Sequence, residues 1–525
     1  MTRVALLCLL LCGCEGMIAD GAAGPRPAAE VETEPCTTCV GASPLGRLTR
    51  LEYVQTLGVA FGPVVDGIPT DTLPEDGAVG PFASNAAPVN VDTLESYQDF
   101  AEDAATVLAA DVGCADRACV ESLIESAGSR LYRGHISAEE SAALLGLFDR
   151  AESPERGLWL VLSAMLQMPR LMYQIEVGSL VDVDGDVRAL TGREIAQRLA
   201  YFLWGRPADQ PLIDAAEAGE LGTPEGIAVQ ARRLLADDRS ELAIADFHRR
   251  WLGLDELVDH PRDDERYPGV DELRADMVAE TEAFTIAIVR GAGTFDELLT
   301  APYTFASDEL AAFYGAPAGE PTGSSALPRV ELDPSQRVGL LTQAAVIGSN
   351  TTEEGSRAAH RASFLLDRFL CEPLGAPPVL DDIPTPPEGL STRETFAAKT
   401  ASPGCQTCHS VLNPLGFLLE HYDASGRYLE LDGDHPIDAS GALPRGAPGS
   451  LDGARDLAVA LSESESVHRC VTRQWFRFAL GREETSHDAA SLEHVLETYR
   501  DAGYELEALI VALVQSPAFR LRRVP

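Results

Sequence analysis

Residues 191–207 read TGREIAQRLAYFLWGRP, and this stretch decides the fold class. Its first four residues form a capping box, in which Thr191 accepts a hydrogen bond from the backbone of Glu194 and Glu194 bonds back to Thr191. An amphipathic run then continues to Trp204, and Pro207 lies beyond its end because proline cannot extend a helix. The stretch therefore predicts a helix that begins after Thr191 and ends at Trp204.

Helical patterns of the same kind cover most of the remaining chain. A serine, a proline and an acid at 153–155 open the apolar run from Leu158 to Met172. Hydrophobic periodicity predicts further helices over 48–57, 224–252, 268–291, 336–347, 355–370, 405–423, 465–480, 486–502 and 504–520. The best strand candidate is a short β-hairpin near 428–437, which turns at Asp432-Gly433-Asp434. We expect a mostly α fold, with a multi-helical N-terminal half packed against a helical C-terminal unit.

Composition narrows the classes of function. The 525 residues include 82 Asp+Glu and 41 Lys+Arg, which gives a net charge of −41. Binding to nucleic acids or to anionic lipid surfaces requires a basic protein surface, and the strong negative charge of this chain argues against both. Lys399 is the only lysine and follows Ala398, so there is no P-loop, and pyridoxal chemistry would depend on this one residue. No G-x-S-x-G or G-x-G-x-x-G motif occurs, and the sequence leaves open whether the protein is an enzyme.

The N-terminus is typical of an export signal. Residues 1–16 read MTRVALLCLLLCGCEG, with Arg3 before an apolar run much shorter than the roughly 20 residues of a membrane span. The run ends in Leu11-Cys12-Gly13-Cys14, which resembles the lipobox of bacterial lipoproteins. In that resemblance Cys14 is the first mature residue and carries the lipid; an ordinary secretory signal is the alternative. We expect an exported cell-envelope lipoprotein, periplasmic or at the outer-membrane surface, that meets the membrane only through this lipid.

Composition shifts divide the chain into segments. The stretches 316–335 and 373–390, rich in proline and small residues, are typical of linkers. The expected segments are a signal peptide at 1–13, a tether at 14–45, helical domains at 46–320, a domain with a Cys-x-x-Cys-His motif at 330–445 and a C-terminal helical domain at 450–525.

The sharpest chemical signal is Cys405-Gln406-Thr407-Cys408-His409. In c-type cytochromes two thiols at this spacing bond covalently to haem, and the histidine that follows ligates the iron. We therefore expect haem c on Cys405 and Cys408, with His409 as a metal ligand. One alternative is a Cys405–Cys408 disulfide with an incidental histidine. Another is a metal or redox dithiol site, although a zinc site would lack a second cysteine pair nearby.

The sixth iron ligand is harder to assign. Methionine fills this position in many cytochromes c, yet no methionine follows Met277. The local alternatives are His421, His435 and His468. We favour His468, because it comes from the last helical domain and could approach the iron from the opposite face. An iron with no sixth ligand from the protein is the other option.

The other cysteines suggest disulfides. Of the 11 cysteines, six remain after the signal, the lipid site and the Cys-x-x-Cys-His motif are set aside. An even number in an exported chain favours disulfides. Two pairs are close in sequence, which leaves one long-range pair; the predicted bonds are Cys36–Cys39, Cys114–Cys119 and Cys371–Cys470.

Several stretches together resemble one known family. They include GLWLVLSAMLQMPRLMYQIEVG (157–178), LTGREIAQRLAYFLWGRPADQPL (190–212), CQTCHSVLNPLGFLLEHYDASGRY (405–428) and CVTRQWFRFALGREE (470–484). The family is the planctomycete and myxobacterial cytochrome-c-like family of exported proteins, built from several domains of unknown function. The resemblance extends over about 47–523. It implies a mostly α fold with a cytochrome-c-like C-terminal unit, and it supplies no established activity.

Three functions follow from these observations. The first is a lipid-anchored extracytoplasmic protein that transfers electrons through a haem, with the turn at 413–417 packed against the ring. The second is a haem-free surface binding or scaffold protein, with Cys405–Cys408 as a disulfide. The third is a haem enzyme of peroxidase type. The sequence identifies neither a redox partner protein nor a polysaccharide ligand.

Overall fold

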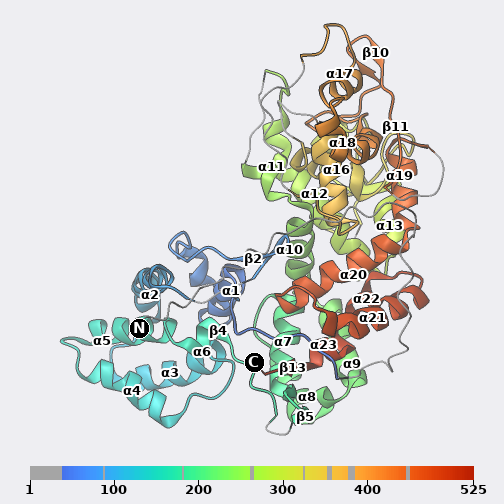
Figure 1. The fold of residues 1–525 in the computed structure, drawn as a ribbon. Helices are drawn as coiled ribbons and strands as arrows, with labels where there is room; N and C mark the ends of the chain where they lie inside the picture. The colour runs from blue at the N-terminus through green and yellow to red at the C-terminus, as the bar shows by residue number, and fades with distance from the viewer. Residues whose placement is uncertain are drawn as a thin grey trace, which may run out of the picture. The chain divides into compact units, whose positions relative to one another are not determined.

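The computed structural model is mostly helical (Figure 1), which confirms the predicted fold class. It describes residues 38–524 except 85, 87–88, 180–181, 260–264, 323–324, 352–356, 376–384 and 445–449. The signal sequence, the predicted lipid site Cys14 and the predicted disulfide residue Cys36 therefore lie outside the described residues. Within the described ranges, no helix is long and apolar enough to cross a bilayer.

The first group of helices encloses a core of its own. These helices are α1 (Arg50–Phe61), α2 (Val91–Val112), α3 (Arg117–Leu131), α4 (Ala138–Asp149), α5 (Pro154–Leu166) and α6 (Pro169–Met172). As predicted, Ser153 caps α5 and Pro154 is its first residue. Buried apolar residues between Leu48 and Met172 form one cluster, so the inward faces of these helices hold each other in place.

The remaining helices follow in the chain, and all except the one at 392–399 contribute buried residues to a second, larger core. They are α7 (Gly192–Trp204), α8 (Gln210–Glu217), α9 (Pro224–Ala236), α10 (Ser240–Leu252), α11 (Asp255–Asp259), α12 (Val270–Arg290), α13 (Phe295–Thr300), α14 (Asp308–Phe313), α15 (Ala344–Ser349), α16 (Arg357–Arg368), α17 (Thr392–Lys399), α18 (Pro403–Gly416), α19 (Gly453–Ser462), α20 (Glu465–Leu480), α21 (Ala489–Asp501), α22 (Leu506–Gln515) and α23 (Pro517–Arg520). The capping box at Thr191 and Glu194 is present, and α7 ends at Trp204 as predicted. Buried residues from Leu190 to Phe519 belong to one cluster, which crosses both of the expected linkers.

The strands are short and form small antiparallel sheets. Strand β9 (Leu431–Asp432) pairs with β10 (His435–Pro436), which confirms the predicted hairpin. The other pairs are β1 (Gly46–Arg47) with β4 (Tyr173–Gln174), β2 (Ala78–Val79) with β3 (Phe82–Ala83), β7 (Tyr303–Phe305) with β8 (Arg329–Glu331), and β11 (Ser440–Gly441) with β12 (Leu451–Asp452). A three-stranded sheet joins β5 (Asp182–Asp184), β6 (Val187–Ala189) and β13 (Leu521–Arg523). This sheet brings the end of the chain back to the start of the larger core.

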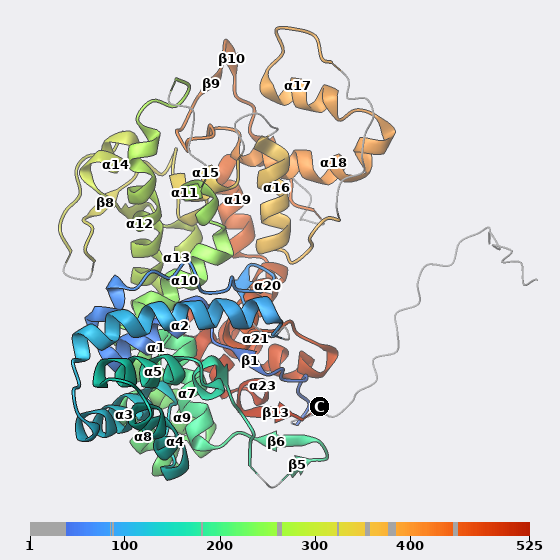
Figure 2. The ribbon, with the colours of Figure 1, turned by 90° about the vertical axis from the view of Figure 1, so that its left-hand side faces the viewer.

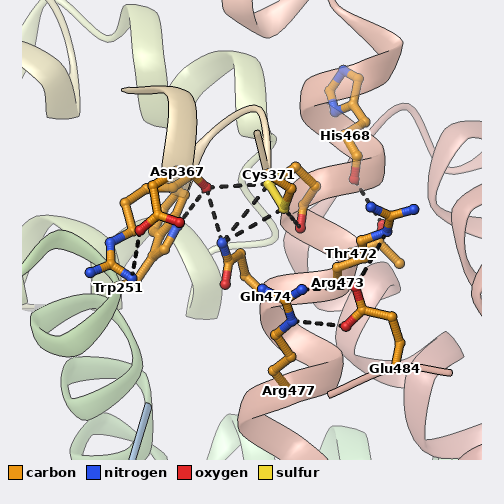
Figure 3. Close-up of a disulfide and its surroundings, with 11 residues drawn as sticks. Trp251, Asp367, Cys371, His468, Thr472, Arg473, Gln474, Arg477 and Glu484 are labelled. Carbon is orange, nitrogen blue, oxygen red and sulfur yellow. Dashed lines mark hydrogen bonds and ion pairs between the residues drawn. A yellow bond between two sulfur atoms is a disulfide. The ribbon is translucent and has the colours of Figure 1, made fainter. Parts of the chain in front are cut away.

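The carboxyl end of α16 is a junction between three parts of the chain (Figure 3). The indole of Trp251, on α10, donates a 3.0 Å hydrogen bond to the carbonyl of Arg368. The amide of Gln474, on α20, donates to the same carbonyl at 3.3 Å. Three residues further on, Cys371 is disulfide-bonded to Cys470 of α20. Helix α16 is therefore held against α10 and α20 at this end.

Candidate functional site

The Cys-x-x-Cys-His motif lies in the first half of α18. Pro403 is the first helical residue, where its fixed φ suits the helix and its missing N–H is not needed. In an α-helix, residues three and four apart lie on one face, so Cys405, Cys408 and His409 share a face. All three side chains are half-buried. Figure 2 shows α18 next to α17, which precedes it in the chain.

Both thiols of the motif are free. The hydroxyl of Ser402 donates to the sulfur of Cys405 at 3.1 Å, and Cys408 packs against the larger core. The scaffold alternative requires a Cys405–Cys408 disulfide, and the structure does not form that bond. The two thiols are therefore not bonded to each other, and both are half-buried on one face of α18.

An apolar wall lies beside the histidine. The ring of Phe396, on α17, meets the imidazole of His409 edge to face at 5.3 Å between centroids. Phe417 follows α18 and packs edge to face on Phe396 at 6.1 Å. Both phenylalanines are buried with Ala358 of α16 in one small cluster. The guanidinium of Arg393 lies over the ring of Phe417, 4.4 Å from its centroid, in a cation–π contact. The apolar wall therefore ends at a positive charge on that side.

A short series of hydrogen bonds connects His409 to the end of α17. Nδ1 of His409 lies 2.9 Å from Oδ1 of Asn413, one helical turn further along α18. Nδ2 of Asn413 donates to Oγ1 of Thr400 at 3.0 Å, and Oγ1 of Thr400 donates to the carbonyl of Phe396 at 2.9 Å. Asn413 and Thr400 are both buried. No hydrogen bond from the described part of the chain reaches Nε2 of His409.

Helix α16 positions α18 by close backbone contact. A Cβ atom on Gly416 would lie 1.9 Å from the carbonyl oxygen of Ala358, so only glycine allows this approach. The buried side chain of Arg361 donates to the carbonyls of Leu419 and Tyr422, just beyond α18. Pro414 does not break the helix, which continues to Gly416 and ends in a 3₁₀ turn at 417–419.

The structure does not bring the predicted sixth ligands to His409. His468 is buried, stacks on Tyr504 at 3.5 Å and has its Nε2 2.8 Å from the carbonyl of Ser462. Burial lowers the pKa of His468 to about 4. The prediction for His468 is therefore corrected: α20 turns this ring toward α21 and the larger core. His421 bonds the carbonyl of Leu429 through Nδ1, and His435 bonds that of Gly389 through Nε2.

Two of the three predicted cysteine pairs are at disulfide distance. Cys114 and Cys119 have a Cα separation of 5.5 Å, and Cys371 and Cys470 one of 5.4 Å. The third pair includes Cys36, which lies outside the described residues.

Most of the side chains around the motif are not predicted by the sequence. The prediction for Asn413 is a turn that packs on a haem, whereas the structure makes it the polar partner of His409. The contact between His409 and Asn413 could have been predicted, because the two residues are four apart on one helix and therefore neighbours. Nothing in the sequence links Thr400 or Phe396 to His409, since they come from a different helix.

Three consecutive segments match models of protein families of unknown function. Residues 190–316 match DUF1592, residues 337–432 match DUF1588 and residues 449–519 match DUF1585. The chain therefore carries three domains of a multidomain family of unknown function, and α18 lies in the second. The junction at Arg368 joins all three, through Trp251, Arg368 and Gln474. Comparisons with curated proteins and with solved structures found no match.

Proposed function

We propose that the protein is an exported, lipid-anchored carrier of electrons, with one haem c held by Cys405, Cys408 and His409. One observation carries this proposal: two free thiols and a histidine occupy one half-buried face of α18. Haem, when bound, would supply one-electron iron chemistry. The motif and the domain match at 337–432 support the assignment.

The residues around the motif fit such a group. Covalent attachment needs two thiols that are not bonded to each other, and Cys405 and Cys408 are free. Haem also needs apolar neighbours, and Phe396 contacts His409 while Phe417 packs edge to face on Phe396. The protein's own contribution would be to hold the imidazole in place, to exclude water on the phenylalanine side and to keep the remaining edge accessible to a redox partner.

Location and family are part of the proposal. The lipobox-like ending at Cys14 supports a lipid anchor in the bacterial cell envelope, at the periplasmic or outer-membrane surface. The series of three matched domains supports membership of the planctomycete and myxobacterial cytochrome-c-like family. A Cys14→Ala variant should move the protein from the membrane fraction to the soluble fraction.

The deciding experiment is expression with the native signal in a host that matures c-type cytochromes. The exported protein should show a Soret band and should keep its haem on acid–acetone extraction and on a denaturing gel. A Cys405→Ala/Cys408→Ala variant should lose this covalent haem. Ser410→Ala, at an exposed position on the same helix, is the matched control and should keep it.

Two results would contradict the proposal. Exported, folded protein with no haem absorbance would support the haem-free binding or scaffold function instead. A high-spin spectrum that changes on addition of peroxide would support the peroxidase-type enzyme.

A further inference from the structure

The hydrogen bonds beside His409 have a defined direction. The hydroxyl of Thr400 lies 2.9 Å from the carbonyl of Phe396 and 3.4 Å from that of Ala397, and a carbonyl can only accept. Because the hydroxyl proton of Thr400 is used in these bonds, Oγ1 of Thr400 must accept from the amide nitrogen of Asn413. The atom of the Asn413 amide that faces His409 is then Oδ1, which can only accept a hydrogen bond. Nδ1 of His409 is the donor that this oxygen requires.

We infer that Asn413 and Thr400 are positioning residues that fix His409 as the Nδ1–H tautomer and leave Nε2 as a bare lone pair. Which ring nitrogen of a neutral histidine carries the proton is set by the hydrogen bond that the other nitrogen makes. Metal-bound histidines have this arrangement, in which one nitrogen donates to a protein group and the other binds the metal. The side chain of His409 is therefore prepared as a ligand through Nε2.

Burial and packing make this arrangement stable. Asn413 is 9% exposed and Thr400 is 6% exposed, so water competes little for their hydrogen bonds. The edge-to-face contact with Phe396 limits rotation of the imidazole. Reversal of the Asn413 amide would turn the Thr400 hydroxyl away from both carbonyls and would place an N–H against Nδ1.

That the ligand is haem iron rests on the proposed function, whereas the tautomer of His409 does not. The first test therefore uses the full chain with Cys405→Ser/Cys408→Ser, which cannot hold haem covalently. Its histidines are labelled with ¹⁵N, and two-bond ¹H–¹⁵N correlation spectra are recorded at pH 9. The His409→Gln variant in the same background identifies the signals of His409.

The expected pattern is a protonated nitrogen at Nδ1 and a bare nitrogen at Nε2. Asn413→Leu should move His409 to a mixture dominated by the Nε2–H form, and Thr400→Val should produce a smaller change of the same sign. Thr400→Ser keeps the hydroxyl and should restore the parent pattern. The matched control is Gln406→Leu, which removes a bond from α18 to the Thr400 carbonyl without touching His409.

The parent chain alone can overturn the inference. If the spectrum of the parent chain shows the proton of His409 on Nε2, the inference is wrong, even if the variants do not fold. An unchanged tautomer in folded Asn413→Leu protein would also overturn it. Absence of haem in the intact protein would instead contradict only the proposed function and leave the tautomer result standing.

Haem-loaded protein gives a second readout. A hydrogen bond from Nδ1 raises the basicity of a ligating imidazole. Asn413→Leu should therefore raise the midpoint potential with unchanged haem content, and Gln406→Leu should leave the potential as in the parent. An unchanged potential in Asn413→Leu would contradict the positioning role in the loaded protein.

Discussion

Two pairs of cysteines in neighbouring parts of the chain are in opposite states. Cys371 and Cys470 are bonded, and Cys470 is 1% exposed at the junction between α16 and α20 (Figure 3). Cys405 and Cys408 are free, and they share the half-buried face of α18. A disulfide between distant segments constrains the chain, whereas free, half-buried thiols can react with a partner. The difference separates a structural role from a chemical one.

Removal of the long-range disulfide should have the largest effect on stability. Its two cysteines are 99 residues apart, and the chain-entropy model gives roughly 4–5 kcal/mol for a loop of this size. A Cys371→Ala/Cys470→Ala variant should lose about that much free energy of unfolding in urea titrations. Its haem content per folded molecule should be unchanged, since the disulfide does not touch the motif.

Cys114→Ala/Cys119→Ala provides the control for loop length. These cysteines are 5 residues apart, and the same model gives about 2 kcal/mol. Equal losses in the two double variants would contradict the view that the long-range bond is the main constraint.

The contact between α16 and α18 connects the structural region to the chemical one. Gly416→Ala would place a methyl group 1.9 Å from the carbonyl oxygen of Ala358, so one of the helices must shift. We expect a loss of about 3 kcal/mol, as for overpacked cores, together with reduced haem attachment. Gly404→Ala, on the same helix with nothing within 4 Å of the added methyl, should change stability by less than about 0.5 kcal/mol. Similar losses for the two variants would contradict the close approach.

The sequence predicted the local features well. The capping box at Thr191 and the hairpin turn at Gly433 are encoded in neighbouring residues, and the spacing of Cys405 and Cys408 becomes a shared face on any helix. Pairings that depend on packing could not be read in the same way. The contact of Thr400 with Asn413 is one case, because it depends on how α17 and α18 meet.

The error at His468 has the same origin. Its position on a predicted helix was correct, but the direction in which the ring points depends on the packing of α20. The pairing of β13 with β6 was also missed, since three-residue strands more than 300 residues apart leave no alternating pattern.

The buried ring of His468 predicts a loss of stability in acid. Its pKa in the folded protein is about 4, below the ordinary 6.5, because burial disfavours the charged form. As pH falls, the unfolded chain takes up this proton first, so stability that is present above pH 6.5 is lost as pH approaches 4. Between pH 7 and pH 5 this one group should reduce the free energy of unfolding by about 2 kcal/mol.

His468→Gln keeps a donor for the Ser462 carbonyl and removes the titrating ring. In urea titrations its free energy of unfolding should fall less steeply with decreasing pH than that of the parent. Near pH 5 the difference in slope should correspond to the uptake of about one proton. His487→Gln, at an exposed histidine, should keep the parental slope. A parental slope in His468→Gln would show that the ring does not contribute to this acid sensitivity.

The smallest expected effect distinguishes two serines that precede the helices of the site. Ser391 forms a capping box with Glu394 at the start of α17, whereas Ser402 makes no capping bond to α18 and donates to the sulfur of Cys405 instead. Loss of a serine cap typically costs about 1 kcal/mol. Ser391→Ala should therefore destabilise the start of α17 by about 1 kcal/mol, and hydrogen exchange at the Glu394 amide should become roughly fivefold faster. Ser402→Ala should cost only a few tenths of a kcal/mol, because no backbone N–H loses its partner. A cost for Ser402→Ala as large as that for Ser391→Ala would mean that the Ser402 hydroxyl supports the backbone of α18, not the thiol of Cys405.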